Sequence, residues 1–286
     1  MDLSIIIVNH NSGDYLKKCL DSLKVSPPRS IFEIFVVDNA SEEGDLQDLE
    51  NDCPEVTLIR NSRNLGFARA INQAIVKARG RYFLILNPDT LIFKNGVDHL
   101  VDFMEEHPEA GAAGPLLLYP DGTRQPSCRS FPTPLKVFFG RTSLLTKWFP
   151  KNPITRSYLM ENRVDLKIME VDWVMGACII LRRKAVEEVG GFDESFFLYV
   201  EDADLCYRLR KKGWRTYFVP QARAIHHYGA SARGERRLVT IEHNKSMYRF
   251  FIKHYRPSLP IKSLLSLGLF TRLFILNLMG IEEVER

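Results

Sequence analysis

Acidic residues flank a run of large apolar side chains in the second half of the sequence. Asp193 and Glu194 precede the run 196–199 (Phe-Phe-Leu-Tyr), and further acids follow it at 201, 202 and 204. A carboxylate beside large apolar groups loses hydration, which raises its pKa toward the range that is useful for proton transfer. A helix start also favours acids, through the helix dipole, but it does not account for the aromatic residues in front of them. The pattern therefore predicts a catalytic site here.

Short β-branched runs alternate with helical patterns along the first 86 residues, which predicts βαβ units around a mostly parallel sheet. The expected strands are Ser4–Asn9, Glu33–Asp38, Val56–Arg60 and Tyr82–Leu86, and the expected helices are Gly13–Lys24, Ser41–Asn51 and Gly66–Ala78. Ligands of such sheets lie beyond the carboxyl ends of the strands. Three polar segments follow strands there, at 9–11, 38–41 and 87–90, and they are candidates for ligand binding.

The second half of the chain is less regular. We expect strands at 114–119, 171–181, 215–219 and 222–225, and then a helix that carries apolar residues between 238 and 251. The proline-rich segment 120–153 has the length of a lid or a substrate-facing loop. The polar segment 229–236 is predicted to be mobile.

The composition is that of an ordinary globular protein, with 286 residues, 45% hydrophobic and 26% charged. This length allows one large domain or a domain with an appendage. The five scattered cysteines form no Cys-x-x-Cys pair, which favours reduced thiols over disulfides or a zinc site. The chain enters an apolar strand directly after Met1, without the features of a signal peptide, so we expect a cytoplasmic protein.

Basic residues strongly outnumber acidic ones between positions 206 and 256. Such a face attracts phosphates or an anionic membrane surface, although a merely solvated basic face is a strong alternative. The formal net charge of the whole chain is only +4, which gives no argument for nucleic acid. We therefore expect no nucleic-acid partner.

The segment 260–281 is strongly apolar but contains Arg272, which argues against a transmembrane span of about 20 apolar residues. As a helix, the segment would carry its polar or small residues in one narrow stripe, at Lys262, Ser266, Asn277 and Gly280. This pattern suits a helix that lies in a membrane interface or packs against a partner. Packing against its own domain is the alternative. We therefore expect a catalytic domain at 1–255 and an apolar C-terminal helical segment at 256–286. A homodimer is one assembly that this segment could support.

Seven short motifs follow one another along residues 3–230. They are SIIIVN at 4–9, VVDNAS at 36–41, NLGFA at 64–68, LNPDT at 86–90, GAC at 176–178, GGFDE at 190–194 and YVEDADL at 199–205. Together they resemble the inverting family 2 glycosyltransferases of the GT-A fold, in the bacterial rhamnosyltransferase-like branch. Their joint occurrence in this order is highly specific. The resemblance implies an α/β fold with a mostly parallel sheet flanked by helices.

The resemblance also implies an activity. We expect transfer of a sugar, with dTDP-rhamnose as the favoured donor, to a glycan or lipid-linked acceptor during cell-surface polysaccharide or O-antigen synthesis. The expected cofactor is Mg²⁺ or Mn²⁺, which neutralises the charge of the departing diphosphate. The expected location is the inner face of the plasma membrane, by peripheral contact.

Roles for individual residues follow from the matching motifs. Asp202 corresponds to the general base and Glu201 to its catalytic neighbour, while Asp204 is assigned to the acceptor, with a helix cap as the alternative. The metal is assigned to Asp89 and to His226, with the adjacent His227 as a rival. The donor-binding residues are Val8, Asn9, Asp38, Asn39, Arg63, Asn64, Asn87, Trp173 and Gly176.

Some of these positions depart from the family's pattern or have a structural alternative. Asn87 stands where the family's metal motif has its first carboxylate, so this site has one carboxylate fewer. Trp173 is as well explained by core packing, and Ser41 by helix capping. Ser231, Arg233 and Arg236 could close over the pyrophosphate, or they could form an ordinary basic surface loop.

Two other functions fit a similar sheet. A nucleotidyltransferase or sugar-nucleotide hydrolase normally has a glycine-rich, basic loop after the first strand, and the segment 9–13 lacks one. A non-catalytic sensor of nucleotide sugars would lack one of the acids Asp89 and Asp202, and both are present.

Overall fold

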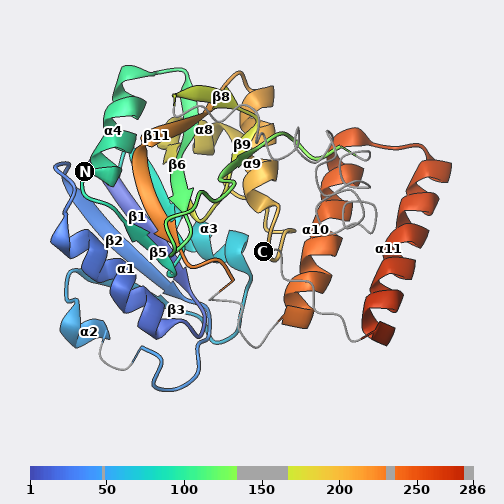
Figure 1. Ribbon diagram of the computed structural model, residues 1–286, viewed down its shortest axis with the longest axis horizontal. Coiled ribbons are helices and arrows are strands. Elements are labelled where there is room, and N and C mark those ends of the chain that lie inside the picture. Colours follow the sequence, from blue (N-terminus) through green and yellow to red (C-terminus); the bar gives the residue numbers. More distant parts are fainter. Residues whose placement is uncertain (47–48, 134–166, 230–235, 280–286) are drawn as a thin grey trace.

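The computed structural model describes residues 1–46, 49–133, 167–229 and 236–279 (Figure 1). At its centre is a sheet in the order β3-β2-β1-β4-β10-β6-β11-β5, with β8 paired to β11. The N-terminal strands are β1 Leu3–Asn9, β2 Phe32–Asp38, β3 Val56–Arg60 and β4 Tyr82–Leu86. They pair in parallel. They are almost continuously apolar because helices cover both faces of this half.

The other half of the sheet is mixed. Its strands are β5 Thr90–Ile92, β6 Ala110–Leu118, β8 Met169–Val171, β10 Cys178–Arg182 and β11 Arg215–His226. Strand β10 is antiparallel to β4 and β6, whereas β6 and β11 are parallel. A separate two-stranded sheet joins β7, Cys128–Arg129, to β9, Trp173–Val174.

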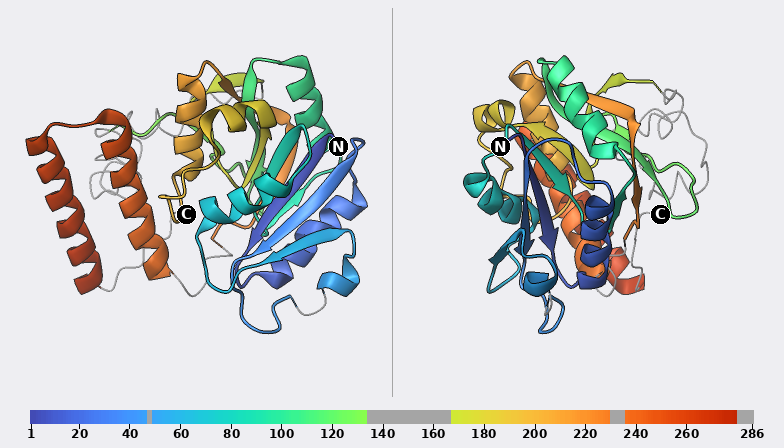
Figure 2. Two further views of the ribbon diagram at one scale, coloured as in Figure 1. Left: turned by 180° about the vertical axis from the view of Figure 1, so that it is seen from behind. Right: turned by 90° about the vertical axis from the view of Figure 1, so that its left-hand side faces the viewer.

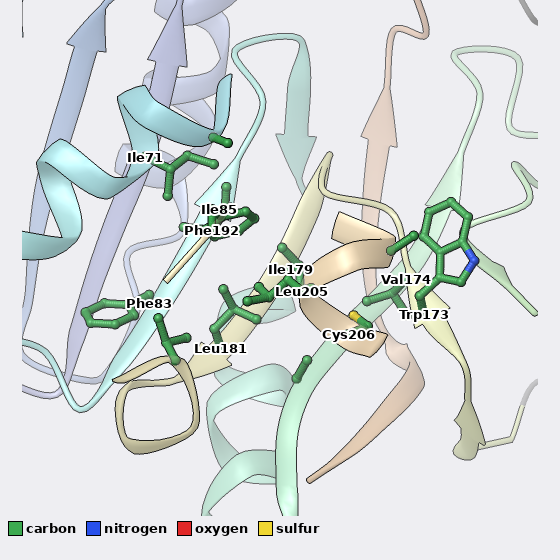
Figure 3. Packing of buried hydrophobic residues seen from close by; sticks show 14 of the residues in the cluster. Ile71, Phe83, Ile85, Trp173, Val174, Ile179, Leu181, Phe192, Leu205 and Cys206 are labelled. Carbon is green, nitrogen blue, oxygen red and sulfur yellow. The ribbon is translucent and has the colours of Figure 1, made fainter. Parts of the chain in front are cut away.

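Two hydrophobic cores lie on opposite faces of the sheet, because successive strand residues alternate between them. Ile5 and Ile7 belong to the core that also holds residues of α1, Gly13–Val25, and α4, Gly96–Glu106. Ile6 and Val8 belong to the other core, part of which Figure 3 shows. That core holds residues of α3 (Phe67–Lys77), α8 (Arg183–Val189), α9 (Glu201–Lys211) and α10 (Arg236–Tyr255).

The predicted sheet with flanking helices is confirmed, but several boundaries were wrong. The helix expected at Ser41–Asn51 is reduced, within the described residues, to the short α2, Leu49–Asp52. Residues 43–46 form turns instead, and in this conformation the carboxylate of Asp45 contacts the start of α1. It accepts hydrogen bonds from the backbone N–H of Gly13 at 2.8 Å and of Ser12 at 3.2 Å.

The strand expected at 171–181 is broken into β8, β9 and β10. The break before β10 is a turn at Gly176 and Ala177, where the backbone N–H of Gly176 donates to Asp202 Oδ2 at 2.8 Å. Conversely, the two strands expected at 215–225 form the single strand β11, whose register against β6 shifts between Val219 and Arg223. Helices α4 and α8 and strand β5 were not predicted.

The C-terminal helices extend from the side of the sheet domain (Figure 2). Helix α10 packs on the domain through Phe250 and Phe251, which are buried. Helix α11, Leu259–Met279, contacts α10. None of the helices in the described part of the chain is long and apolar enough to cross a membrane.

Candidate active site

A cavity lies beyond the carboxyl ends of β1 and β4, where α9 begins and β11 ends. Its polar lining residues are His10, Asn39, Asn64, Asn87, Asp89, Glu201, Asp202, His226 and Tyr228. The other lining residues are Val8, Gly66, Phe67, Pro88, Met175, Gly176, Ala177, Phe197, Leu198, Tyr199, Gly229, Leu238 and Val239. The cavity therefore brings together Asp89 and Asp202, which lie 113 residues apart in the sequence.

The start of α9 is fixed by an unusual backbone. Tyr199 and Val200 have φ angles of 64° and 68°, in the left-handed region that costs free energy for non-glycine residues and most of all for a β-branched one. The preceding backbone is held from two sides. Phe197 O accepts a hydrogen bond from Phe67 N at 2.8 Å, and Leu198 O accepts one from Ser246 Oγ at 3.0 Å. These contacts direct the first turn of α9 into the cavity.

Asp202 and Glu201 are adjacent acids in that first turn. Burial raises the pKa of Asp202, although the backbone N–H groups of Gly176 and Ala203 donate to its carboxylate and oppose the rise. Burial, followed by the negative charge of Asp202, raises the pKa of Glu201 well above its ordinary value. Glu201 is 5% exposed, and its Oε2 has no hydrogen-bond partner among the residues that the structure describes. Because the two carboxyl groups interact, ionisation of both at once is disfavoured. A carboxylate in this setting is suited to accepting a proton.

Asp89 and His226 form the second polar group of the cavity. Both are almost completely buried, and His226 Nε2 lies 3.3 Å from Asp89 Oδ1. The neighbouring backbones are tied together, because His227 N donates to Asp89 O at 2.9 Å. Asn87, which also lines the cavity, is held by its backbone N–H to Ala177 O at 2.9 Å.

An oxygen and an imidazole nitrogen at this separation fit a divalent cation. Adjacent ligands of an octahedral ion with bonds of about 2.1 Å lie about 3 Å apart. Within the described residues, no group of three or more His, Cys, Asp or Glu side chains could hold a metal. A cation at Asp89 and His226 would therefore need further ligands from a diphosphate or water, as is common for Mg²⁺.

Another part of the cavity lining is a network of asparagines around the N-terminal end of α3. Asn39 Nδ2 donates to Asn64 Oδ1 at 2.7 Å, and the same oxygen accepts the backbone N–H of Gly66 at 2.9 Å. Asn39 Oδ1 accepts the backbone N–H of Leu65 at 2.9 Å. The network fixes polar groups at the cavity edge before any ligand arrives.

Five of the residues assigned from the sequence do not line the cavity: Asn9, Asp38, Arg63, Trp173 and Asp204. Asn9 Nδ2 donates to Asp45 Oδ2 at 2.8 Å, and Asp38 Oδ1 accepts the backbone N–H of Ser41 at 3.1 Å. Trp173 is buried and donates to Ser130 O at 3.0 Å, in keeping with the core-packing alternative.

Asp204 is completely buried, and its carboxylate joins α9 to α10. Arg208 Nε lies 2.7 Å from Oδ2, while Lys253 Nζ at 2.6 Å and His254 Nε2 at 2.7 Å contact Oδ1. Burial opposes the charge, but the hydrogen bond from His254 and the cations Arg208 and Lys253 lower the pKa of Asp204. The carboxylate therefore faces protein cations, and the structure gives it no contact with the cavity.

Other residues that shape the site were not assigned from the sequence. His10 and Tyr228 line the cavity, and Gln125 contacts His226 from behind. His10 follows the first strand in a polar segment that the sequence did single out, but Gln125 has no local signal. Of the expected loop residues, Ser231 and Arg233 lie outside the described residues, and Arg236 is described only as the start of α10.

Comparison with known proteins identifies the family and the fold of this chain. The profile of the family "Glycosyl transferase family 2" matches residues 4–190, well over half of the chain. N-acetylglucosaminyl-diphospho-decaprenol L-rhamnosyltransferase of Mycobacterium tuberculosis is 33% identical over 259 residues, which cover 87% of this chain and 83% of that protein. Rhamnosyltransferase WbbL of Escherichia coli K12 is 28% identical, covering 87% and 92%.

Solved structures show the same GT-A fold. The mannosyltransferase PcManGT of Pyrobaculum calidifontis, in complex with GDP-Man and Mn²⁺, superposes with a TM-score of 0.61 at 19% identity. The alignment covers 94% of this chain and 69% of that one. GalNAc-T7, solved with UDP, GalNAc and Mn²⁺, gives a TM-score of 0.59 at 18% identity, covering 79% and 44%.

Proposed function

Because the chain belongs to glycosyl transferase family 2, we propose that it moves rhamnose from dTDP-rhamnose to a lipid-linked acceptor, with inversion at the anomeric carbon. Two relatives that it matches over most of their length are named as rhamnosyltransferases, and the name of one includes a diphospho-decaprenol acceptor. The proposal extends to cell-surface polysaccharide synthesis, which agrees with an O-antigen biosynthesis protein of Myxococcus xanthus that is 31% identical over 242 residues.

The observation that carries this proposal is one cavity lined by two chemically different groups of side chains. Asp89 and His226 form the group that suits a diphosphate with its cation, and Asp202 is the carboxylate that suits an attacking hydroxyl. The cation, Mg²⁺ or Mn²⁺, would neutralise the negative charge of the departing nucleoside diphosphate. Asn64 and Asn87 supply amide groups for the nucleotide, while Asn39 holds Asn64 in place by its side-chain hydrogen bond. Gly176 admits the sugar close to the backbone.

Asp202 acts in this proposal as the general base. It accepts the proton of the acceptor hydroxyl, whose oxygen forms a bond to the anomeric carbon as the bond to the diphosphate breaks. The raised pKa of Asp202 strengthens it as a base, while its two backbone hydrogen bonds hold the carboxylate in place. Glu201 keeps a proton more readily than Asp202, because burial and the neighbouring charge both disfavour its ionised form.

The remaining wall supports an acceptor with an apolar part. Phe67, Phe197, Tyr199, Leu238 and Val239 all line the cavity. The last two come from the first turn of α10, the helix that α11 contacts. The apolar lining of the cavity therefore includes residues of α10, and in this proposal it receives the apolar part of an acceptor held by its lipid in a membrane.

Helix α11 supports peripheral membrane contact. Leu264, Leu267, Phe270 and Phe274 recur at helical spacing and are 54–69% exposed. The other side of the helix faces α10, where Ser266 Oγ lies 2.7 Å from Tyr248 Oη. From 236 to 279 the chain carries eight Lys or Arg residues and one acid, Glu242, which favours an anionic lipid surface.

The function is tested by incubating the purified protein with dTDP-rhamnose, Mn²⁺ and a polyprenyl-diphospho-N-acetylglucosamine acceptor. Transfer should release dTDP and add one rhamnose to the acceptor. Release of dTMP with rhamnose 1-phosphate would instead indicate hydrolysis, and formation of dTTP from dTDP-rhamnose on addition of pyrophosphate would indicate nucleotidyl transfer. A parallel panel of UDP- and GDP-sugars, read by thermal shift with and without Mn²⁺, tests the donor, and a shift with another donor alone would replace rhamnose.

A further inference from the structure

Behind the metal-binding end of the cavity lies a buried glutamine. Gln125 is 3% exposed, does not line the cavity, and places its Oε1 2.7 Å from His226 Nδ1. His226 thus stands between two polar side chains, with Gln125 at Nδ1 and Asp89 at Nε2. Both ring contacts are shielded from solvent.

The backbone around Gln125 is firmly held. Its N–H donates to Leu117 O at 2.9 Å, next to a tight turn in which Tyr119 N donates to Thr123 O at 2.8 Å. Within that turn, Asp121 Oδ1 accepts both the backbone N–H of Thr123 at 2.8 Å and its hydroxyl at 2.6 Å. Leu117 belongs to β6, which pairs with β11, so Gln125 is anchored to the neighbour of the strand that carries His226.

The contact with Gln125 determines which ring nitrogen carries the proton. An amide oxygen only accepts hydrogen bonds, so the 2.7 Å contact requires a proton on Nδ1. In the neutral ring, Nε2 then presents a lone pair, and it does so 3.3 Å from a carboxylate oxygen of Asp89. Two acceptors face one another, and a cation between them would satisfy both.

The opposite orientation of the amide has the opposite consequence. Gln125 would then donate to Nδ1, and the proton on Nε2 would point to Asp89. His226 and Asp89 would form a closed hydrogen-bonded pair without a lone pair on the ring for a metal. The orientation of the Gln125 amide therefore decides whether Asp89 and His226 can bind a metal or form only a buried hydrogen-bonded pair.

We infer that Gln125 is a positioning residue for the metal centre: it holds His226 as the Nδ1–H tautomer and presents the lone pair of Nε2 beside Asp89. The inference rests on the cation in the proposed function and adds a residue to it. Histidines that bind metals usually donate their second N–H to such a partner, and loss of that partner typically costs about 10–100-fold in metal affinity. The loss of metal affinity should reach this range here, because only two protein side chains, Asp89 and His226, are assigned to the cation.

The first test measures Mn²⁺ affinity, from the electron paramagnetic resonance signal of free Mn²⁺, with and without dTDP. Gln125→Met removes the acceptor at similar side-chain volume and should weaken Mn²⁺ binding by about 10–100-fold. Gln125→Glu keeps an acceptor and should bind Mn²⁺ as tightly as the wild type or more tightly. Gln221→Met makes the same change at an exposed position of β11 and should leave the affinity unchanged.

The second test detects the tautomer of His226 directly in the wild-type protein, so it does not depend on the folding of a variant. Long-range ¹H–¹⁵N spectra of the wild type with Mg²⁺ and dTDP should show His226 protonated at Nδ1 only. Protonation at Nε2 only would overturn the inference, as would Gln125→Met with wild-type Mn²⁺ affinity. A wild-type protein that binds no Mn²⁺ would refute the cation itself, and with it this part of the proposed function.

Discussion

Replacing Asp202 by asparagine tests the general base with little change in shape. Proton transfer by a positioned base contributes about 10²–10⁴-fold to a rate, so kcat for rhamnose transfer should fall by that factor. At about 1.4 kcal/mol per tenfold, this corresponds to about 3–5 kcal/mol of transition-state stabilisation. Affinity for dTDP, measured by calorimetry, should stay at the wild-type value because the nucleotide is proposed to bind to other residues, namely Asp89 with its cation and the asparagines.

The local contacts of Asp202 indicate that this variant keeps its fold. The asparagine oxygen can still accept the backbone N–H of Gly176, which lies 2.8 Å from Oδ2. Its amide nitrogen would face the N–H of Ala203 and lose that hydrogen bond, at a cost of about 1 kcal/mol. Against this loss, Glu201 is relieved of the neighbouring negative charge that raises its pKa. The melting temperature should therefore change little.

The pH dependence provides a second signature. The base acts only when ionised, and burial raises the pKa of Asp202, so wild-type transfer should fall as the pH falls through that raised pKa. The residual activity of Asp202→Asn should lack this acidic limb. Asp98→Asn is the matched control, because Asp98 is a buried carboxylate on α4 that does not line the cavity. Transfer by Asp202→Asn within a few-fold of wild type would refute the assignment.

Further predictions concern stability and membrane contact. Asp204→Asn should destabilise the fold by about 1.5–3 kcal/mol in urea unfolding, because it removes the charge of a completely buried carboxylate that Arg208 and Lys253 contact; an unchanged midpoint would contradict this. Burial opposes ionisation of Asp193, but hydrogen bonds from Lys253 and the 195 backbone lower its pKa to about 2. Since the folded pKa lies below the unfolded value of about 3.9, the stability that Asp193 contributes is present above pH 4 and should be lost as the pH falls toward 2 in acid unfolding. Gly66→Ala should lower the melting temperature, because φ is +85° and the new Cβ would lie 2.6 Å from a backbone oxygen. Replacing Leu267 and Phe270 by serine should abolish co-sedimentation with phosphatidylglycerol vesicles; loss of a dimer in light scattering instead would identify α11 as a subunit interface.

The sequence predicted the parallel half of the sheet well because β1, β2 and β4 are largely buried and read as nearly continuous apolar runs. It failed at 41–51, where a contact with a segment that is distant in sequence decides the local structure. Asp45 gives its hydrogen-bonding capacity to the start of α1, and this contact has no local signature. A contact between segments distant in sequence also explains the broken strand near Gly176, because its backbone N–H donates a hydrogen bond to Asp202.

The candidate site divides in a similar way. Positions with a motif, such as Asp89 and Asp202, line the cavity, because the motif couples residue type to the end of a strand or the start of a helix. Asp204 belongs to the same motif but points into the protein, since two residues along a helix change the direction of a side chain by about 200°. Gln125 could not be found, because its contact with His226 depends on the pairing of β6 with β11.

The position of α10 limits how far this enzyme can be shortened. The family match ends at residue 190, before the helix that carries Asp202. A fragment cut after β11 would keep Asp202 but would leave Asp204 with Arg208 as its single cationic contact, and it would remove the wall formed by Leu238 and Val239. The shortest fragment expected to express as a working transferase therefore ends after Tyr255, and deletion of α11 alone should separate catalysis from attachment to lipid.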